Sequence, residues 1–254
     1  MYVFDLRYPG SRIVDSDKER AWEIQRLVSL LEGQLTDAAV ALNLFIGEAN
    51  RPPAALTPHQ SGGEQEQVEA LVAEYAREVP QEELGRLYPL LYEAAVQEVE
   101  RKAWREGRMP GTYQERIIYL HAHSYVYALD SFEKLLQVLT EYFRGAEKYH
   151  RDFKAVFPGL TWVRNSAHHV EDRSRGLDNK GKRMVLKPMK GPLVHAGGGV
   201  LILSCLSGNR LQYTMQDGAL GEVEVSERQL SEAVRIFQEL LDALPWGGRP
   251  RLRP

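Results

Sequence analysis

Cysteine is almost absent from this sequence. The single residue, Cys205, cannot form an intramolecular disulfide or a multi-thiolate metal site, which excludes a secreted disulfide scaffold. The chain also lacks any run of about 18 apolar residues without charge, which excludes a membrane span. The first twenty residues carry Asp5, Arg7 and Arg12 and no apolar run of signal-peptide length. We therefore expect a cytoplasmic protein with no membrane partner.

Neither sign of charge predominates. The 32 Lys and Arg residues against 35 Asp and Glu residues give a formal net charge of -3, so the protein as a whole does not attract nucleic acid or anionic lipid from a distance. Any basic surface must therefore be local. The 254 residues are 43% hydrophobic and 26% charged, which is ordinary for a globular chain that buries a core.

Apolar residues recur at three- and four-residue steps through most of the chain, as in amphipathic helices. Capping-box patterns at Ser16, Thr112 and Ser226 mark three helix starts. Gly145 and Gly176 are natural helix ends. Helices are predicted over residues 16–49, 64–78, 80–99 and beyond, 112–145, 146–157, 160 to about 175, and 226–244.

A different pattern lies before the last helix. Residues 193–196, 200–206 and 210–216 are rich in strand-forming side chains, and Asp217-Gly218 reads as a turn. Long antiparallel helices joined by short loops must bury their apolar stripes on one another. The sequence thus predicts a mainly all-α, up-and-down helical bundle with a small three-stranded antiparallel β meander. We expect one domain over 1–254, with the β excursion at about 193–226 and a loose C-terminal tail at 246–254.

The sequence lacks the patterns of common metal sites and of a phosphate-binding loop. His121 and His123 are two residues apart on a helix and point about 200° apart, which does not make a shared metal site. A ferritin-like metal bundle requires Glu-x-x-His pairs on two helices, and the sequence has only one such pair, Glu147 with His150. The glycines at 197–199 precede a strand and lack the following Lys-Ser/Thr of a phosphate loop. We predict no metal and no cofactor.

Polar chemistry is concentrated between Trp162 and Arg173. On a helix, the residues of this segment form two neighbouring polar stripes. Such a density of guanidinium, imidazole and carboxylate groups is typical of a polar cleft, but a solvated face laced with ion pairs has the same spacing. The first stripe contains Arg164, His168, Glu171 and Arg175, and the second contains Asn165, His169 and Asp172.

The segment from Arg164 to His169 resembles the Arg-x(4–6)-His motif of the HEPN superfamily of helical-bundle nucleases. The motif opens a late helix after a long bundle helix, as in that superfamily, and the resemblance covers roughly residues 112–175. It implies a HEPN-like helical domain that acts as a homodimer with a composite cleft. The implied activity is a metal-independent endoribonuclease that attacks through the RNA 2′-hydroxyl and leaves 2′,3′-cyclic phosphate ends.

The resemblance also implies roles for individual residues. Arg164 stabilises charge on the phosphoryl oxygens and His169 transfers the proton. Asn165 orients His169, and Glu171 or Asp172 fixes its tautomer. Helical geometry favours His168 instead, because it lies about 40° from Arg164 whereas His169 lies about 140° away. The family further implies a toxin or phage-defence role, with an antitoxin or nucleotidyltransferase as partner.

A glycine- and proline-interrupted loop downstream supplies the local basic surface. It would contact several RNA phosphates, although a solubilising mobile loop would have the same composition. The predicted RNA-binding residues are Lys180, Lys182, Arg183, Lys187 and Lys190.

Two other functions fit the same residues. One is a HEPN-like module that no longer cleaves and binds a nucleotide, RNA or a protein partner. The other is a structural interaction protein whose 160–175 helix is a salt-bridged dimer face. Alanine at Arg164 or His169 would abolish cleavage in the enzyme, weaken binding in the module, and lower dimer stability in the third case.

Overall fold

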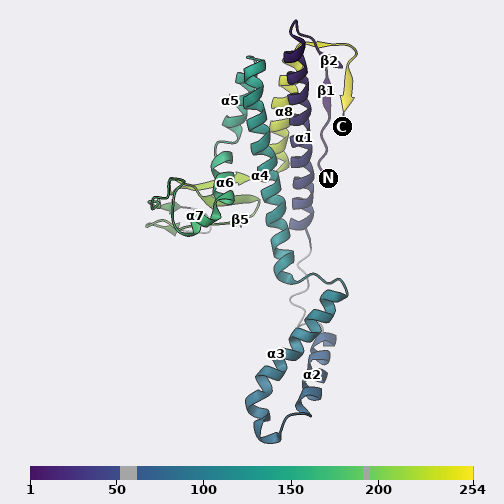
Figure 1. Ribbon diagram of the computed structural model, residues 1–254, viewed down its shortest axis with the longest axis vertical. Helices are drawn as coiled ribbons and strands as arrows, with labels where there is room; N and C mark the ends of the chain where they lie inside the picture. The colour runs from purple at the N-terminus through teal and green to yellow at the C-terminus, as the bar shows by residue number, and fades with distance from the viewer. Residues whose placement is uncertain (52–61, 191–194, 254) are drawn as a thin grey trace. The chain divides into compact units, whose positions relative to one another are not determined.

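The computed structural model describes residues 1–51, 62–190 and 195–253, and within them the fold is mainly helical (Figure 1). The prediction of a helical bundle with a small antiparallel sheet before the last helix is confirmed. None of the helices in these ranges combines the length and apolar character needed to cross a membrane. The helices are α1 (Lys18–Ala49), α2 (Gly62–Ala76), α3 (Gln81–Arg105), α4 (Gly111–Tyr142), α5 (Ala146–Val156), α6 (Leu160–His168), α7 (Val170–Ser174) and α8 (Glu227–Ala243).

The contacts of the chain gather in two compact units, whereas the sequence pattern predicts one domain over 1–254. Unit 1 contains residues 1–46 and 119–254, and unit 2 contains residues 47–118. Every candidate site residue predicted above belongs to unit 1.

The core of unit 1 lies between α1, α4, α5 and α8. Phe132 of α4 marks its centre, because its ring lies 5.1 Å from that of Phe153 on α5 and 5.7 Å from that of Phe237 on α8. All three rings are fully buried, as are Leu31 and Leu42 on α1. Burial of such a side chain contributes roughly 1.5–3 kcal/mol, so this interior fixes α4 against its neighbours.

The meander consists of β5 (Cys205–Ser207), β6 (Arg210–Thr214) and β7 (Leu220–Glu224), with β6 in the centre. Helix α6 packs on β6 and β7. β5 corresponds to the end of the predicted 200–206 strand and β6 to the predicted 210–216 strand, whereas β7 lies in a segment where no strand was predicted. Part of the predicted 193–196 strand lies outside the described residues, and its end forms β4 (His195–Ala196), paired with β3 (Met189–Lys190).

The expected loose tail is wrong for residues 246–253. β1 (Leu6–Tyr8) pairs with β9 (Arg251–Arg253), and β2 (Arg12–Ile13) pairs with β8 (Trp246–Gly247), both antiparallel. The Tyr8 ring holds the pairing together, because the Arg251 guanidinium lies 4.6 Å from its centroid and the Trp246 ring meets it edge-on at 5.5 Å. The composition of the tail does not predict these strands, because their partner strands lie at the other end of the sequence.

Unit 2 contains the antiparallel pair α2 and α3. A small core joins them, formed by Val68, Val72, Ala95 and Val99. Pro80 stands immediately before α3, where a proline has no helix hydrogen bond to lose.

Candidate functional site

The predicted 160–175 helix is broken at His169. This residue has φ −105° and ψ 48°, outside the helical region, and it separates α6 from the five-residue α7. The C-terminal end at Gly176 is as predicted, since this glycine has φ +70°. Because the helix does not continue through His169, the two polar stripes drawn on a regular helix end at His168. The 140° angle between Arg164 and His169 therefore no longer argues against their acting together.

Arg164 is anchored on α4. Its Nε donates to Oδ2 of Asp130 at 2.7 Å, and Nζ of Lys134 approaches the same oxygen at 2.5 Å. The side chain of Asp130 is 3% exposed and that of Arg164 is 15% exposed. No further hydrogen bond of Arg164 is found within the described residues. The carboxylate thus fixes the guanidinium through Nε, and the two Nη groups have no hydrogen-bond partner among the described residues.

A second carboxylate on α4 supports the base of the site. Glu133 accepts from Oγ1 of Thr161 at 2.8 Å, and its other oxygen lies 3.1 Å from Nε2 of His150. It therefore links the first turn of α6 and the middle of α5 to α4. Sequence reasoning missed both Asp130 and Glu133. The available signal was their position, since two carboxylates at a three-residue step follow Val126 along the edge of the apolar stripe of a long helix.

The two adjacent histidines lie together on the surface. Their ring centroids are 5.1 Å apart, and the His168 ring meets the Tyr127 ring of α4 edge-on at 6.4 Å. Nδ1 of His169 lies 3.4 Å from a carboxylate oxygen of Glu171, and the imidazole is 49% exposed. A carboxylate at Nδ1 favours the tautomer with the proton there, which leaves Nε2 as the base.

The structure brings Glu171 to the predicted tautomer-fixing position and places Asp172 elsewhere. Asp172 accepts from Nη2 of Arg175 at 2.6 Å. Asn165 is half-buried and its backbone carbonyl accepts from the His169 amide at 3.0 Å. Among the described residues its side chain makes no hydrogen bond to His169, so the structure does not show the predicted orienting contact, and the backbone bond is the last helical bond of α6.

A metal ion has one group of potential ligands in the described part of the chain. Atoms of His169, Glu171 and Asp172 lie within 4.8 Å of one another. Glu171 and His169 already interact with each other, and Asp172 with Arg175. Exposed carboxylates commonly lie this close without a metal, and we assign no ion to them.

The basic loop begins directly after α7. Asp178 organises it by accepting from the backbone N–H groups of Lys180 at 2.8 Å and Lys182 at 2.9 Å. The pKa of Asp178 lies below its ordinary value because the charged carboxylate accepts these hydrogen bonds. The bond from the Lys182 N–H group has the largest effect, and that from Lys180 comes second. The buried Arg173 ties the loop to α7 by donating to the Leu177 carbonyl at 2.6 Å.

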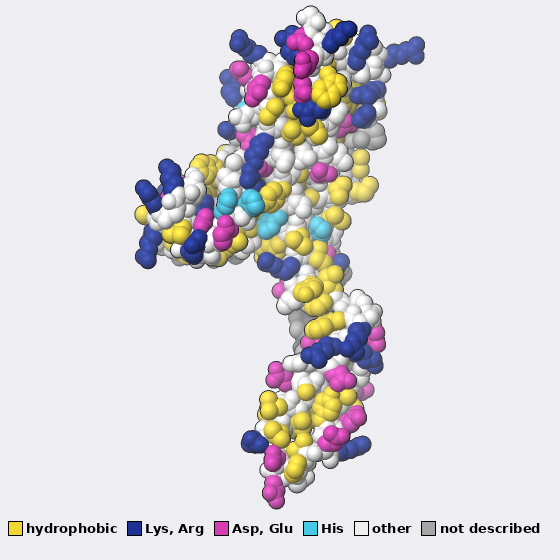
Figure 2. Space-filling view, viewed as in Figure 1, with side chains coloured by type: hydrophobic (Ala, Val, Ile, Leu, Met, Phe, Trp, Pro, Cys, Tyr) yellow, Lys and Arg dark blue, Asp and Glu magenta, His cyan; other side chains and the backbone are white. Residues whose placement is uncertain are grey.

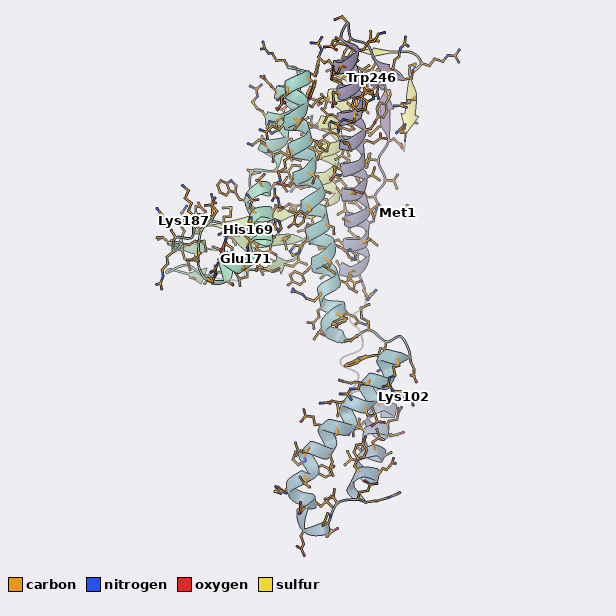
Figure 3. The ribbon with its side chains drawn as sticks, in the orientation of Figure 1. Met1, Lys102, His169, Glu171, Lys187 and Trp246 are labelled. Atoms are coloured by element: carbon orange, nitrogen blue, oxygen red, sulfur yellow. The ribbon has the colours of Figure 1, made fainter. Side chains whose placement is uncertain are left out.

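The predicted RNA-binding residues do not form one uniform patch. Lys180, Lys182 and Arg183 are exposed. Lys187 is paired with Asp217 of the β6–β7 turn at 2.6 Å, and Lys190 lies in β3 opposite His195, with its side chain outside the described set. Figure 2 shows Lys and Arg side chains around this end of unit 1, next to His side chains, and Figure 3 shows Lys187, His169 and Glu171 on the same side.

Comparisons with protein-family models, with curated proteins and with solved structures give no match to this chain. The function is therefore argued from the geometry of the site.

Proposed function

We propose that this protein is a metal-independent endoribonuclease of the HEPN type. The observation that carries the proposal is the placement of Arg164, fixed by a buried carboxylate at the start of the turn that exposes His168 and His169. A positioned cation and an accessible imidazole on the same short helix segment are the minimum equipment for cleavage by an internal hydroxyl.

In the proposed reaction, Nε2 of His169 takes the proton of the RNA 2′-hydroxyl. The 2′-oxygen attacks phosphorus, and the bond to the 5′-oxygen breaks. The Arg164 guanidinium stabilises the negative charge on the phosphoryl oxygens. A second imidazole, either His168 or one brought by a second copy of the chain, protonates the leaving oxygen. The products are a 2′,3′-cyclic phosphate end and a 5′-hydroxyl end.

The surroundings support RNA as the substrate. Lys180, Lys182 and Arg183 extend from the loop that follows α7, and they supply phosphate contacts that the net charge of -3 does not. In a homodimer, a single cleft would contain two copies of the motif and two copies of the basic loop. We further propose a cytoplasmic toxin or phage-defence role for such a nuclease, with an antitoxin or nucleotidyltransferase as its partner.

A second candidate function has an observation in its favour. Arg164 is largely buried against Asp130, an arrangement that also suits a purely structural arginine. In that case the surface of α6 and α7 is a non-catalytic module that binds a nucleotide, RNA or a protein.

The deciding experiment incubates the purified protein with mixed cellular RNA in EDTA and determines the product ends. We expect 2′,3′-cyclic phosphate ends, lost in Arg164→Ala and His169→Ala, whereas Arg175→Ala cleaves normally. Comparison of His168→Ala with His169→Ala shows which of the two imidazoles cleavage requires. Arg164→Lys keeps a charge next to Asp130, and circular dichroism reports whether each variant is folded. If no RNA is cleaved, or if folded His168→Ala and His169→Ala both cleave at the wild-type rate, the nuclease is excluded.

A further inference from the structure

A groove of about 490 Å³ lies between α1 and α4 in unit 1. Val40 and Leu44 of α1 provide apolar walls and are about half exposed. Tyr127 of α4 lines the same groove and is 38% exposed as a residue. An accessible aromatic face beside aliphatic side chains suits a flat apolar ligand.

The groove is continuous with the motif. The Tyr127 ring contacts the His168 ring, which lies next to the His169 ring. Figure 2 shows His side chains following one another across the surface of unit 1. A row of exposed rings is a typical track for single-stranded nucleic acid, because successive bases stack on aromatic faces. A nucleotide next to the one at His169 would therefore place its base near Tyr127.

Two polar side chains of α1 add hydrogen-bonding groups to the groove. Gln34 and Asp37 both line the groove, three residues apart on the same helix face. Within the described residues, neither side chain makes a hydrogen bond or an ion pair. The amide group of Gln34 and the two carboxylate oxygens of Asp37 are therefore available to a ligand. A carboxylate in a groove that must accept an RNA chain repels phosphate, and its use is to accept hydrogen bonds from a base.

We propose that this groove binds a guanine base of single-stranded RNA adjacent to the cleaved nucleotide. Guanine presents two neighbouring N–H donors and one carbonyl oxygen along its Watson–Crick edge. The donors match the two oxygens of Asp37, and the carbonyl oxygen matches the amide N–H of Gln34. Adenine has one amino donor and no carbonyl oxygen on that edge and satisfies neither pattern. The identity of the RNA rests on the proposed function, whereas the base preference rests on the groove.

Binding of RNA that cannot be cleaved tests the groove directly. The probes are fluorescent 12-mers with 2′-O-methyl groups, which block the attacking hydroxyl, made of adenosine alone or with one central guanosine or inosine. Fluorescence anisotropy with the full chain should show about tenfold tighter binding of the guanosine RNA, within the range of a bidentate base contact. The inosine RNA, which lacks the amino group, should be intermediate.

Three variants locate the effect. Asp37→Asn should remove the guanosine preference, and Tyr127→Leu should weaken both RNAs about fivefold or more through lost stacking. Glu23→Gln, on α1 and outside the groove, should bind as the wild type does. Equal binding of guanosine and adenosine RNAs, or an unchanged preference in Asp37→Asn, overturns the proposal. So does a change in oligomeric mass of Asp37→Asn in light scattering, since the groove would then be covered by a second copy.

The test separates the two proposals. If RNA is cleaved in EDTA but guanosine is not preferred, the groove assignment is wrong and the nuclease stands. If guanosine RNA binds selectively but no RNA is cleaved, the groove proposal stands and the nuclease is excluded. Titration with GMP and AMP, followed by NMR shifts around Tyr127, gives an independent reading, and equal shifts with both nucleotides count against the groove.

Discussion

Asp130 is the residue on which the site depends most directly. Its carboxylate is buried, two cations approach one of its oxygens, and Oδ1 has no partner among the described residues. Buried charges of this kind contribute little net stability as pairs, but removing one member leaves the other uncompensated. Asp130 therefore fixes the orientation of Arg164, and its loss would also destabilise the fold.

Asp130→Asn should lower the free energy of unfolding by about 3 kcal/mol, because Arg164 and Lys134 lose their counter-charge while the shape is kept. Urea denaturation measures this cost. Asp152→Asn removes a half-exposed partner of Lys148 and should cost less than about 1 kcal/mol. Equal costs for the two substitutions would show that Asp130 does not hold Arg164.

Asp178 should make the order of the basic loop depend on pH. The pKa of its carboxyl group lies below the ordinary 3.8 because the charged form accepts the Lys182 and Lys180 N–H groups. A depressed pKa means that the stabilisation is complete above pH 3.8 and is lost as the pH falls through the lower, folded-state value. The amide shifts of Lys180 and Lys182 in an NMR titration should report that midpoint. Asp178→Asn should abolish their titration, and a midpoint at or above 3.8 would contradict the prediction.

At the scale of elements, helix starts and turns were predictable where one local interaction decides them. Ser226 caps α8 by accepting from the Gln229 N–H, as its capping box predicts. The N-cap of α1 is one residue later than predicted, because Asp17 rather than Ser16 accepts the first N–H groups, from Glu19 and Arg20. In both cases a side chain within three residues decides the outcome.

The break in the motif helix could not be predicted in the same way. His169 is neither glycine nor proline, and the residues around it carry no stop signal. Asp130 and Glu133 were missed for a related reason, since the partners that connect them to α5 and α6 lie more than fifteen residues away in the sequence. The sequence thus predicts the motif residues, whereas their relative placement depends on tertiary contacts.

The β6–β7 turn should be sensitive to a single methyl group. Gly218 has φ +77°, and a Cβ there would overlap the Val185 carbonyl of the basic loop. Gly208 has a similar φ of +60° and open space around it, so Gly208→Ala should cost only the backbone strain of about 1 kcal/mol. Gly218→Ala should cost at least about 1 kcal/mol more in urea denaturation, because the loop must move. Equal costs would mean that the loop does not lie against the turn.

At the scale of the whole molecule, the bundle was predictable from helix periodicity, but its division into two units was not. Periodicity identifies apolar faces and does not say which faces pack together. The residues of α2 and α3 show the same helical pattern as those of unit 1, yet the buried members of their core are small side chains such as Val72 and Ala95, and the larger Leu71, Tyr75 and Tyr92 are only partly buried. Stability should differ between the units accordingly.

Native-state hydrogen exchange should reveal that difference. The amides around Val99 in unit 2 should open with a free energy at least about 2 kcal/mol lower than those around Leu129 in unit 1, where aromatic rings are buried. The measurement compares protection factors at several denaturant concentrations. Equal opening energies would mean that the two units unfold as one cooperative structure.

The pairing of β1 with β9 and of β2 with β8 imposes an order on synthesis. Residues 6–13 leave the ribosome long before their partner residues 246–253 exist. At translation rates of about 5–20 residues per second, the delay is roughly 10–50 s. During that time Tyr8 has neither Trp246 nor Arg251 beside it. A nascent chain therefore completes this part of its structure only after the helical bundle has been synthesised, and an interrupted message yields a product with unpaired first strands.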